Sequence, residues 1–297
     1  MHAEDRQGPN ARADELPEAL RDGYSIVRRL PLGAHGPAWL LGARGGTGRA
    51  VLKYLTAGSL PGSLFTKTLR QAISLASTCP TAVPVLEILE DGAGIWLLRQ
   101  WQAGETLAEA LTTLGQLTFA QTLALAEGVY RGLLANEHEL IVHGHLAPGN
   151  VLIQPTGSVS IADHGLRAAG ARLAQPQPLP YLAPEQVGGG PPSTQGDVYA
   201  LGALLYTCLC GQYPLAFSAD GRGDDEVLAR HEIRTPSTAQ VSGALGHVIW
   251  KALQPRPADR FATAAELLEA FDGTAGKGGS AQQKGRRGLF RRGRGQS

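Results

Sequence analysis

His143-Gly-His-Leu-Ala-Pro-Gly-Asn150, followed by the apolar run Val151-Leu-Ile153, is the stretch of sequence that decides the fold. It comes after the segment Phe119–Asn136, whose apolar residues recur at helical spacing, and the apolar run itself is typical of a short buried strand. Asp163-His-Gly165 follows a little further along the chain. The pattern therefore predicts a loop with several polar side chains, held between a helix and a strand.

Further short motifs lie on either side of this loop. Upstream, Leu32-Gly-Ala-His-Gly36 stands between two predicted strands, and Ala50-Val-Leu-Lys53 lies on the next strand. Downstream come Tyr181-Leu-Ala-Pro-Glu185, Asp197-Val-Tyr-Ala-Leu-Gly202 and Asp259-Arg-Phe261. Each motif alone is a weak signal, but the whole series in this order, each in a suitable strand or helix context, is a specific one.

The periodicity of the apolar residues divides the chain into a strand-rich part and a helical part. Alternating patterns predict strands over Tyr24–Leu30, Trp39–Ala43, Ala50–Leu55, Val85–Glu90 and Ile95–Arg99. Helical spacing predicts helices over Phe65–Ser77, Phe119–Asn136, Val198–Cys210, Leu245–Leu253 and Ala264–Phe271. Thr263 and Glu266 have the spacing of a capping box at the start of the last helix. The predicted fold class is α+β.

Composition and charge limit the possible functions. The chain has 297 residues, 43% of them hydrophobic, which excludes a wholly disordered protein. Seven of the 27 basic residues and none of the 26 acidic residues lie in residues 277–297, so the rest of the chain is mildly acidic, which argues against an overall basic nucleic-acid-binding protein. The basic tail itself is consistent with contact to acidic lipid or nucleic acid, or equally with a solvated tail.

Three cysteines, an odd number without the Cys-x-x-Cys spacing, argue against a disulfide framework and against a zinc site. The polar start of the chain predicts no signal peptide, and the longest mainly apolar run, Val198–Cys210, is too short to span a bilayer, so we expect a cytoplasmic protein without a transmembrane segment. The predicted organisation is a flexible arm over residues 1–22, a domain over residues 23–272 and a disordered basic tail over residues 273–297.

In their order and context, the motifs resemble the bacterial serine/threonine protein kinase family of eukaryotic type. The resemblance implies a bilobal protein-kinase-like fold, with a strand-rich N-lobe over residues 23–101 and a helical C-lobe over residues 102–272. It also implies ATP and Mg²⁺ as ligands and proteins as partners.

The resemblance assigns the ligand-binding roles residue by residue. Lys53 matches the lysine that pairs with the nucleotide phosphates, and Gly33 and Gly36 fall in the turn that covers them. Asn150 and Asp163 match the two residues that hold Mg²⁺, and their hard oxygen atoms suit that ion.

Other positions match the structural residues of the family. His143 corresponds to a packing histidine, and Asp197 to an aspartate that braces the backbone of the catalytic loop. Glu185 and Arg260 correspond to a buried ion pair within the helical lobe. The resemblance therefore predicts a preserved framework.

Two departures from the family pattern fall on the residues that carry the chemistry. An active kinase of this family reads His-Arg-Asp-Leu-Lys-Pro-x-Asn, whereas here His145 stands in place of the aspartate and Ala147 in place of the lysine. The aspartate accepts the proton of the substrate hydroxyl, a role worth roughly 10²–10⁴-fold in rate. The lysine stabilises the transferring phosphate, an effect on the order of 10²–10³-fold.

Further departures point the same way. Gln71 aligns with the glutamate that pairs with Lys53 in the family, which reduces an ion pair to a neutral hydrogen bond at best. Pro178 replaces the threonine that usually lies three residues before Tyr181, and no Ser or Thr lies between residues 163 and 185 to accept an activating phosphate.

These departures favour a pseudokinase, a protein that keeps the kinase fold and the residues for ATP and Mg²⁺, lacks the catalytic aspartate, and works as a signalling scaffold or regulator. The alternative is an active, non-conventional Ser/Thr protein kinase that transfers the γ-phosphate of ATP with His145 as the proton acceptor, because the ordinary pKa of an imidazole, about 6.5, suits a base. A third hypothesis is a small-molecule phosphotransferase, since His143-Gly144 and Pro148-Gly149-Asn150 are similar to the corresponding loop of the aminoglycoside and choline kinases.

Two local questions stay open at the level of sequence. The histidines at 143, 145 and 164 lie close to Asp163 in the motifs and would suit a metal site, although packing roles are the more usual ones for such residues in this fold. Arg99 aligns with the residue at the back of the adenine pocket, where a bulky cation would hinder the nucleotide, but a shift of one residue puts Leu98 there instead.

Overall fold

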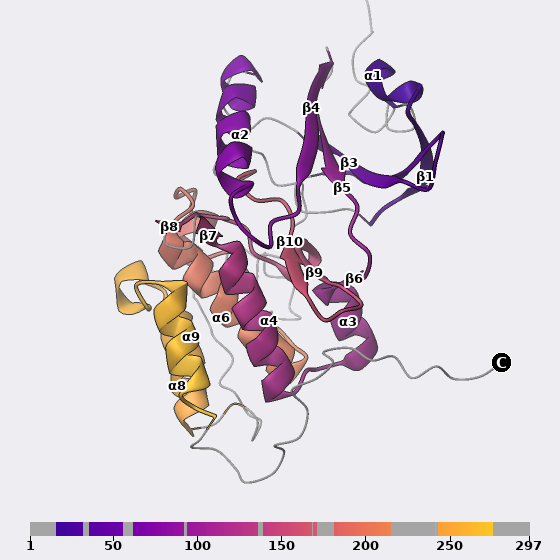
Figure 1. Cartoon of the computed structure of the whole chain (residues 1–297). Helices are drawn as coiled ribbons and strands as arrows, with labels where there is room; N and C mark the ends of the chain where they lie inside the picture. The colour runs from indigo at the N-terminus through magenta and orange to yellow at the C-terminus, as the bar shows by residue number, and fades with distance from the viewer. Residues whose placement is uncertain are drawn as a thin grey trace, which may run out of the picture. The chain divides into compact units, whose positions relative to one another are not determined.

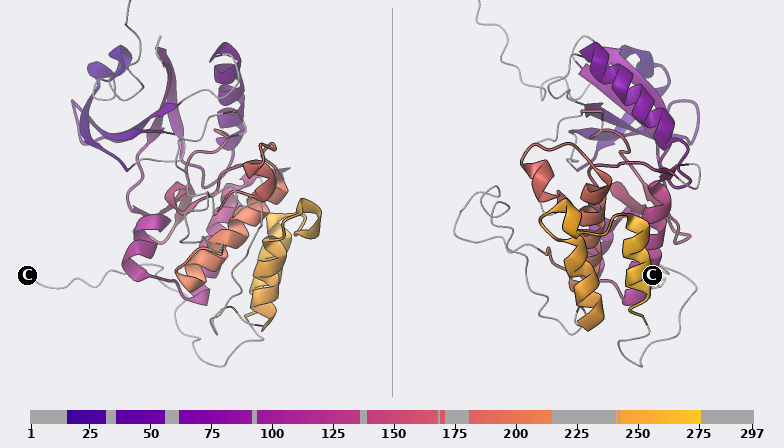
Figure 2. Two further views of the ribbon diagram at one scale, coloured as in Figure 1. Left: turned by 180° about the vertical axis from the view of Figure 1, so that it is seen from behind. Right: turned by 90° about the vertical axis from the view of Figure 1, so that its left-hand side faces the viewer.

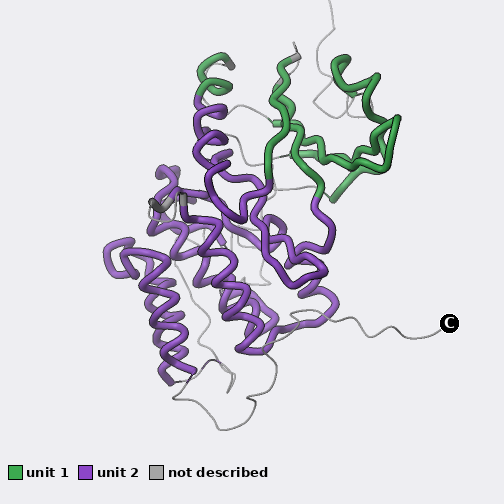
Figure 3. Tube along the Cα trace, in the orientation of Figure 1, with its two compact units in different colours: residues 1–67, 84–101, 170–175 green, residues 68–83, 102–169, 176–297 purple. Residues whose placement is uncertain are grey.

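The computed structural model describes residues 16–31, 36–55, 62–91, 94–135, 139–167, 169–170, 181–214, 241 and 243–275. The chain divides into two compact units, coloured separately in Figure 3. Unit 1 comprises residues 1–67, 84–101 and 170–175, and unit 2 comprises residues 68–83, 102–169 and 176–297.

Unit 1 is built on one antiparallel five-stranded sheet with the strand order β1-β2-β3-β5-β4. The strands are β1 (Tyr24–Arg29), β2 (Ala38–Ala43), β3 (Arg49–Leu55), β4 (Val85–Asp91) and β5 (Gly94–Gln100). Figure 1 labels β1, β3, β4 and β5. Each of the strands predicted from alternating apolar residues is present, with bounds within one residue of those expected.

The register of the sheet divides the side chains of β3 and β5 between two faces. Lys53 pairs with Leu97 and Leu52 pairs with Leu98, and directly paired residues of an antiparallel ladder project from the same face. One face carries a buried apolar cluster of unit 1: Leu16, Leu20, Trp39, Leu41, Ala50, Leu52, Trp96 and Leu98. The ring of Trp96 lies at its centre, 5.6 Å from the Trp39 ring and 4.9 Å from the Tyr54 ring between centroids.

The N-terminal residues that the structure describes differ from the arm expected for residues 1–22. A short helix, α1 (Glu18–Arg21), precedes β1, and both Leu16 and Leu20 are buried in the apolar cluster of unit 1. Residues 16–22 therefore belong to the packed unit, because their apolar side chains find a partner in the sheet that local sequence cannot reveal. Residues 1–15 lie outside the described residues.

Unit 2 is mainly helical. Its helices are α3 (Leu107–Leu114), α4 (Phe119–Gly132), α5 (Pro184–Val187), α6 (Thr194–Cys210), α8 (Gly243–Ala252) and α9 (Ala264–Asp272), with 3₁₀ turns η1 (Pro148–Asn150) and η4 (Pro257–Asp259). Helix α2 (Gly62–Ala76) begins in unit 1 and ends in unit 2. Short strands complete the unit: β6 (Glu105–Thr106), β9 (Val151–Ile153) and β10 (Val159–Ile161) form one small sheet, and β7 (Leu134–Ala135) pairs with β8 (Glu139–Leu140).

The core of unit 2 surrounds α6. Every residue of α6 from Gly196 to Leu209 is buried, which is typical of a helix that is covered on all sides. Helices α4, α8 and α9 pack around it, as both views in Figure 2 show. Asp197 lies in the first turn of this helix, so the polar end of a buried helix faces the loop that the sequence singled out.

Helix α4 ends earlier than its sequence pattern predicts. Apolar residues continue to Asn136, but the helix stops at Gly132, where a Cβ atom would lie 2.5 Å from Cδ1 of Ile161. Strand β10 therefore packs against the last turn of the helix, and residues 134–135 form β7 instead. This close contact between distant segments is not visible in the local periodicity.

The start of α9 agrees with the sequence in part. Oγ1 of Thr263 accepts a hydrogen bond from the backbone N–H of Glu266 at 3.2 Å, which is the predicted cap. The Glu266 carboxylate accepts from the N–H of Ala262 rather than from that of Thr263, so the reciprocal half of the capping box is displaced by one residue.

A sheet unit followed by a helical unit confirms the predicted α+β fold class. Within the described residues, no helix is both long enough and apolar enough to cross a membrane.

Candidate active site

The loop of residues 143–150 is braced by Asp197. Oδ2 of Asp197 accepts a hydrogen bond from the backbone N–H of His143 at 2.7 Å, and Oδ1 accepts from the N–H of Gly144 at 2.8 Å. Burial raises the pKa of this carboxyl to about 7, although the two N–H donors act to lower it. The contact has the bracing role that the motif implies, and it ties the loop to the start of α6.

Gly144 has a backbone that a side chain would disturb. Its φ is 79°, in the left-handed region, and a Cβ atom there would lie 2.7 Å from Cβ of Pro192. Its carbonyl oxygen accepts a hydrogen bond from Nε2 of Gln186 at 3.1 Å. No pattern in the sequence singles out Gln186, which follows directly after the Tyr181–Glu185 motif.

The His143 ring joins the loop to the residue before Asp163. Its Nδ1 accepts a hydrogen bond from the N–H of His145 at 3.2 Å, and its Nε2 lies 2.9 Å from the carbonyl oxygen of Ala162. The two contacts are satisfied together by the neutral tautomer with the proton on Nε2. His143 is fully buried, so it has the packing role that the family resemblance implies.

The structure brings Asn150 and Asp163 together. Nδ2 of Asn150 donates to the carbonyl oxygen of His145 at 3.0 Å, and the carbonyl oxygen of Asn150 accepts from the N–H of Ala162, the neighbour of Asp163, at 2.9 Å. Asp163 has a φ of 68° and is the only residue other than glycine with a positive φ in the described part of the chain. A left-handed backbone costs roughly 1–2 kcal/mol, and such strain is typical of functional positions.

The chemistry of these two residues suits Mg²⁺. The hydrogen bond of Nδ2 turns the amide nitrogen of Asn150 toward the loop, so Oδ1 is the atom that remains to act as a ligand, and Asp163 supplies a carboxylate. Mg²⁺ commonly takes one or two protein oxygens and completes its shell with water and phosphate. The pair is therefore sufficient for an ion held jointly with a polyphosphate ligand.

The alternative of a histidine-based metal site finds no support in the described residues. No group of three or more His, Cys, Asp or Glu side chains among them is placed to hold a metal. Nε2 of His164 lies 2.6 Å from the carbonyl oxygen of Gly132, and the His164 and His143 rings meet edge to face at 4.8 Å between centroids. Burial lowers the pKa of His164 to about 3, so this ring is a neutral packing group.

His145 lies in the same hydrogen-bonded loop. Its backbone N–H donates to His143, its carbonyl accepts from Asn150, and the residue is 3% exposed. Two residues later, Ala147 packs against the apolar core of unit 2, so an apolar group occupies the position of the family's lysine.

Buried carboxylates near the loop are few. Asp163 and Asp197 are the only buried acidic residues in the described part of the chain, and both oxygens of Asp197 accept backbone hydrogen bonds. Asp197 is thus committed to bracing the loop rather than to accepting a proton from a bound molecule.

In unit 1, Lys53 and Gly36 lie close together. Lys53 is buried on β3, and its neighbour Tyr54 donates its N–H to the carbonyl of Pro37 at 3.0 Å. Gly36 has a φ of 127°, and a Cβ atom there would lie 2.7 Å from the carbonyl oxygen of Tyr54, so only glycine allows this turn to approach β3. The other predicted glycine, Gly33, lies outside the described residues.

The register of β3 and β5 decides between Arg99 and Leu98. Arg99 pairs with Val51 and therefore shares a face with Lys53, whereas Leu98 pairs with Leu52 and is buried in the apolar cluster on the opposite face. We call the first of these the Lys53 face; it consists of Val51, Lys53, Leu55, Ile95, Leu97 and Arg99. Arginine, not leucine, is thus the residue that accompanies the lysine.

The structure does not place the remaining predicted positions, Gln71, Pro178 and the basic tail, beside the residues described so far. Gln71 is exposed on α2. A Cβ atom built on Gly165, in the Asp163 motif, would lie 2.7 Å from Cβ of Ala72, so the neighbour of Gln71 packs closely against that motif. The role expected for Gln71 beside Lys53 therefore stays a prediction. Pro178 and the basic tail from residue 277 lie outside the described residues.

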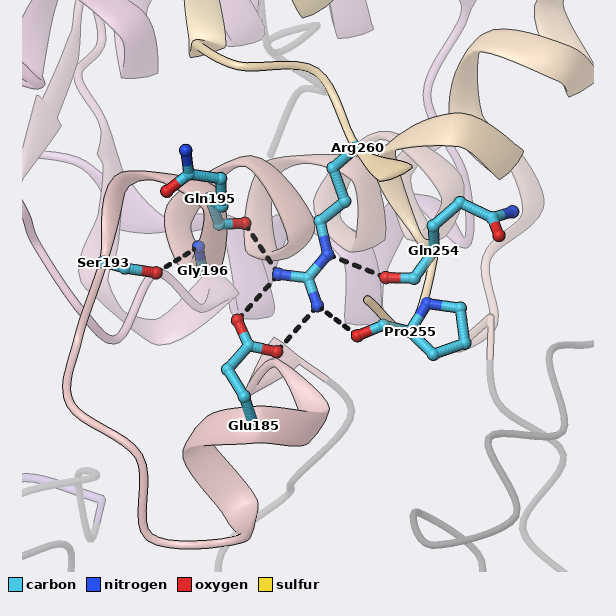
Figure 4. A network of polar contacts seen from close by, with 7 residues as sticks. All are labelled: Glu185, Ser193, Gln195, Gly196, Gln254, Pro255 and Arg260. Atoms are coloured by element: carbon cyan, nitrogen blue, oxygen red, sulfur yellow. Dashed lines mark hydrogen bonds and ion pairs between the residues drawn. The ribbon is translucent and has the colours of Figure 1, made fainter. Parts of the chain in front are cut away.

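Arg260 is the centre of a separate polar network within unit 2 (Figure 4). Its guanidinium makes two hydrogen bonds of 2.7–2.8 Å with the carboxylate of Glu185. Its remaining hydrogen bonds go to the carbonyl oxygens of Gln195, Gln254 and Pro255 at 2.7–2.9 Å. The Arg260 side chain is completely buried, so this network has the structural role that the motifs imply.

Comparison with known proteins agrees with these features. The family model described as the protein kinase domain matches residues 67–271. The chain is 27% identical over 225 residues to the serine/threonine-protein kinase PrkC of Bacillus subtilis, covering 70% of this chain and 34% of PrkC. It is 34% identical over 220 residues to the DNA damage-responsive serine/threonine-protein kinase RqkA of Deinococcus radiodurans, covering 67% of this chain and 31% of RqkA.

A third relative, the serine/threonine-protein kinase PknB of Mycobacterium tuberculosis, is 29% identical over 187 residues, covering 58% of this chain and 29% of PknB. The matched region thus spans about a third of the length of these curated relatives. The motif order, the sheet and helical units, the braced loop and the family match together show that the chain belongs to the protein kinase domain family.

Proposed function

We propose that this protein is a pseudokinase: it binds ATP and Mg²⁺, transfers little or no phosphate, and acts on protein partners by binding them. Lys53 and the turn that contains Gly33 and Gly36 would hold the phosphates, and Asn150 and Asp163 would hold Mg²⁺. When bound, the ion supplies positive charge that neutralises the phosphate oxygens.

The observation that supports the proposal is the identity of the residue at the position of the proton acceptor. His145 takes that position in a loop whose frame is otherwise intact, from the Asp197 brace to the Asn150 hydrogen bond. Ala147 adds the loss of a cation beside the transferring phosphate. Because both losses concern groups that act in the transition state, they would lower the rate of transfer without removing the residues that hold ATP and Mg²⁺.

A phosphate-transfer assay tests the proposal. The full chain would be incubated with labelled ATP, Mg²⁺ or Mn²⁺ and a general protein substrate, with Asp163→Ala as the background control. We expect the wild type and Asp163→Ala to incorporate equal, background amounts of phosphate. Transfer by the wild type that Asp163→Ala abolishes would show that the protein is an enzyme.

Restoring the missing groups sharpens the test. The double variant His145→Asp with Ala147→Lys places an acceptor and a cation in the loop, and we expect it to gain measurable transfer over the wild type. The two single variants are the matched controls, because each restores one group only. No gain in the double variant would indicate that other departures, such as Gln71 or Pro178, also prevent transfer.

The alternative function, an active kinase with His145 as the base, makes a different prediction in the same assay. His145→Ala would then remove transfer that the wild type shows, and the rate would rise with pH as the imidazole loses its proton. A wild type that remains inactive from pH 6 to pH 9, a range chosen to span the titration of an imidazole, excludes this alternative.

A cytoplasmic location goes with the proposal, since ATP and Mg²⁺ are cytoplasmic ligands. It remains a prediction, as does the expectation that the binding partners are proteins.

A further inference from the structure

We propose that Lys53 and Arg99 together form a polyphosphate-binding site on the Lys53 face of unit 1, in which Arg99 adds a second cation for the phosphate chain. The proposal rests on the proposed function for the role of Lys53. It goes beyond it in assigning Arg99 and in stating which part of a ligand the face selects.

The first support is the placement of the two cations. Arg99 pairs with Val51, and Lys53 lies two residues further along β3, so the two cations are diagonal neighbours on one face. Such neighbours are about 7–8 Å apart at the backbone, within reach of long side chains. An ammonium and a guanidinium can therefore converge on the same chain of phosphates.

The second support is the charge of the surrounding strands. Strands β2, β3 and β5 contain no Asp or Glu at all. On β4, Glu90 pairs with Ile95 and so shares this face, but it is exposed, and Ile95 lies four residues from Arg99, roughly 13 Å along β5. The three described strands β2, β3 and β5 thus contribute no acidic side chain to the Lys53 face.

The third support is the apolar frame of the two cations. Val51, Leu55, Ile95 and Leu97, the other members of the face, are all buried. A charged group acts more strongly on an anion when its surroundings are of low polarity than when they are water. The frame therefore favours anion binding at these two side chains over the exposed arginines elsewhere on the sheet.

Arginine also determines the kind of anion. Its planar fork makes two parallel hydrogen bonds to phosphate oxygens, whereas lysine acts as a point charge. Arg49 is the first residue of β3, but it is exposed and its guanidinium lies over the Trp101 ring at 5.1 Å. Arg99 is consequently the arginine of this strand pair best placed to act with Lys53.

Titration calorimetry with inorganic tripolyphosphate tests the proposal on the full chain, without added divalent cations so that Asn150 and Asp163 do not contribute. We expect the wild type to bind tripolyphosphate, and Arg99→Met to weaken this binding about 10- to 100-fold, as expected for the loss of one charge-assisted contact. Lys53→Met should weaken it to a similar extent. The matched control is Arg29→Met: Arg29 is exposed on β1 and pairs with Trp39 on the other face, so its loss should leave the affinity unchanged.

A second variant and a second probe keep the test decisive if Arg99→Met does not fold. Arg99→Lys keeps the charge and loses the fork, so it should bind tripolyphosphate with an affinity between those of the wild type and the methionine variant. Adenosine, which has the base without phosphates, should not compete. Affinity for tripolyphosphate that is unchanged in Arg99→Met and Arg99→Lys, or adenosine that competes as well as tripolyphosphate, would overturn the proposal.

The outcomes separate the two proposals. Phosphate transfer by the wild type contradicts the pseudokinase proposal and leaves the tripolyphosphate result untouched. An affinity for tripolyphosphate that does not change when Arg99 is replaced contradicts the present inference and does not affect the result of the transfer assay.

Discussion

The network around Arg260 and the loop around His145 lie in the same helical unit, yet they depart from the family pattern to different degrees. Arg260 is fully buried and bonded to the carboxylate of Glu185 and to three backbone carbonyls, as the motifs imply. The loop keeps its brace from Asp197 and its Asn150, but a histidine stands where the proton acceptor is expected. The difference teaches that the groups that stabilise this fold and the groups that transfer phosphate are separate side chains, so either set can change alone.

The largest expected effect comes from breaking the network. Arg260→Ala should lower the free energy of unfolding by about 3–5 kcal/mol, because it leaves the carboxylate of Glu185 without its cation and several carbonyls without their donor. Urea denaturation followed by circular dichroism measures the change.

Arg256 provides a matched control for this prediction. It also pairs with an acid, Asp259, at 2.7 Å, but its side chain is 81% exposed. Arg256→Ala should therefore change the free energy of unfolding by less than about 1 kcal/mol. Equal losses in the two variants would show that burial of the ion pair is not what stabilises this region.

An intermediate effect is expected where the backbone of the loop is constrained. Gly144→Ala should lower the free energy of unfolding by about 2–3 kcal/mol, because an alanine is strained in the left-handed backbone of this position and its Cβ would meet Cβ of Pro192. The same variant should weaken the brace from Asp197, since the N–H of Gly144 is one of its two donors. Thermal and urea unfolding give the stability.

Gly149, five residues along the same loop, is the control for Gly144. It is exposed, and a Cβ atom built there meets no other atom within 4 Å. Gly149→Ala should stay within about 0.5 kcal/mol of the wild type. If both alanine variants are equally stable, the close approach of Pro192 to the loop is not a feature of the protein in solution.

Local sequence predicts the elements of this protein better than their contacts. The strands and helices follow from apolar periodicity because each is set by residues two to four apart. The end of α4 at Gly132, the burial of Leu16 and Leu20, and the exposure of Gln71 depend instead on segments far away in the chain. No local pattern contains that information.

The candidate site shows the same division. Motif order identified His145, Asn150, Asp163 and Lys53, but the sequence alone could not decide between Arg99 and Leu98, because a shift of one residue reverses the face of a strand. The pairing of β3 with β5 decides it. The backbone of Ala162, which links the loop to Asp163, also escapes a search for functional side chains, since any residue supplies such an N–H and carbonyl.

The smallest expected effect concerns how stability varies with pH, and it separates the packing histidines from the loop chemistry. Burial lowers the pKa of His164 from 6.5 to about 3. Between these values the unfolded chain binds a proton at this residue and the folded chain does not, so acid favours unfolding. This one group should therefore reduce the free energy of unfolding by up to about 1.4 kcal/mol for each pH unit below 6.5.

His164→Phe removes this dependence while keeping a ring of similar size beside His143. At neutral pH the variant should be less stable by about 1–3 kcal/mol, because the carbonyl of Gly132 loses its partner. The gap should narrow as the pH falls from 6.5 to 5, because only the wild type is penalised by proton uptake on unfolding. Burial raises the pKa of Asp197 to about 7, so this residue makes the free energy of unfolding fall as the pH rises from about 4 to 7, which is the opposite of the effect of His164. The effect of Asp197 is the same in the wild type and in His164→Phe, so it cancels in the difference between their free energies of unfolding, which urea unfolding curves measure. Parallel pH profiles for wild type and variant would mean that His164 titrates normally and is not the neutral packing group that its burial indicates.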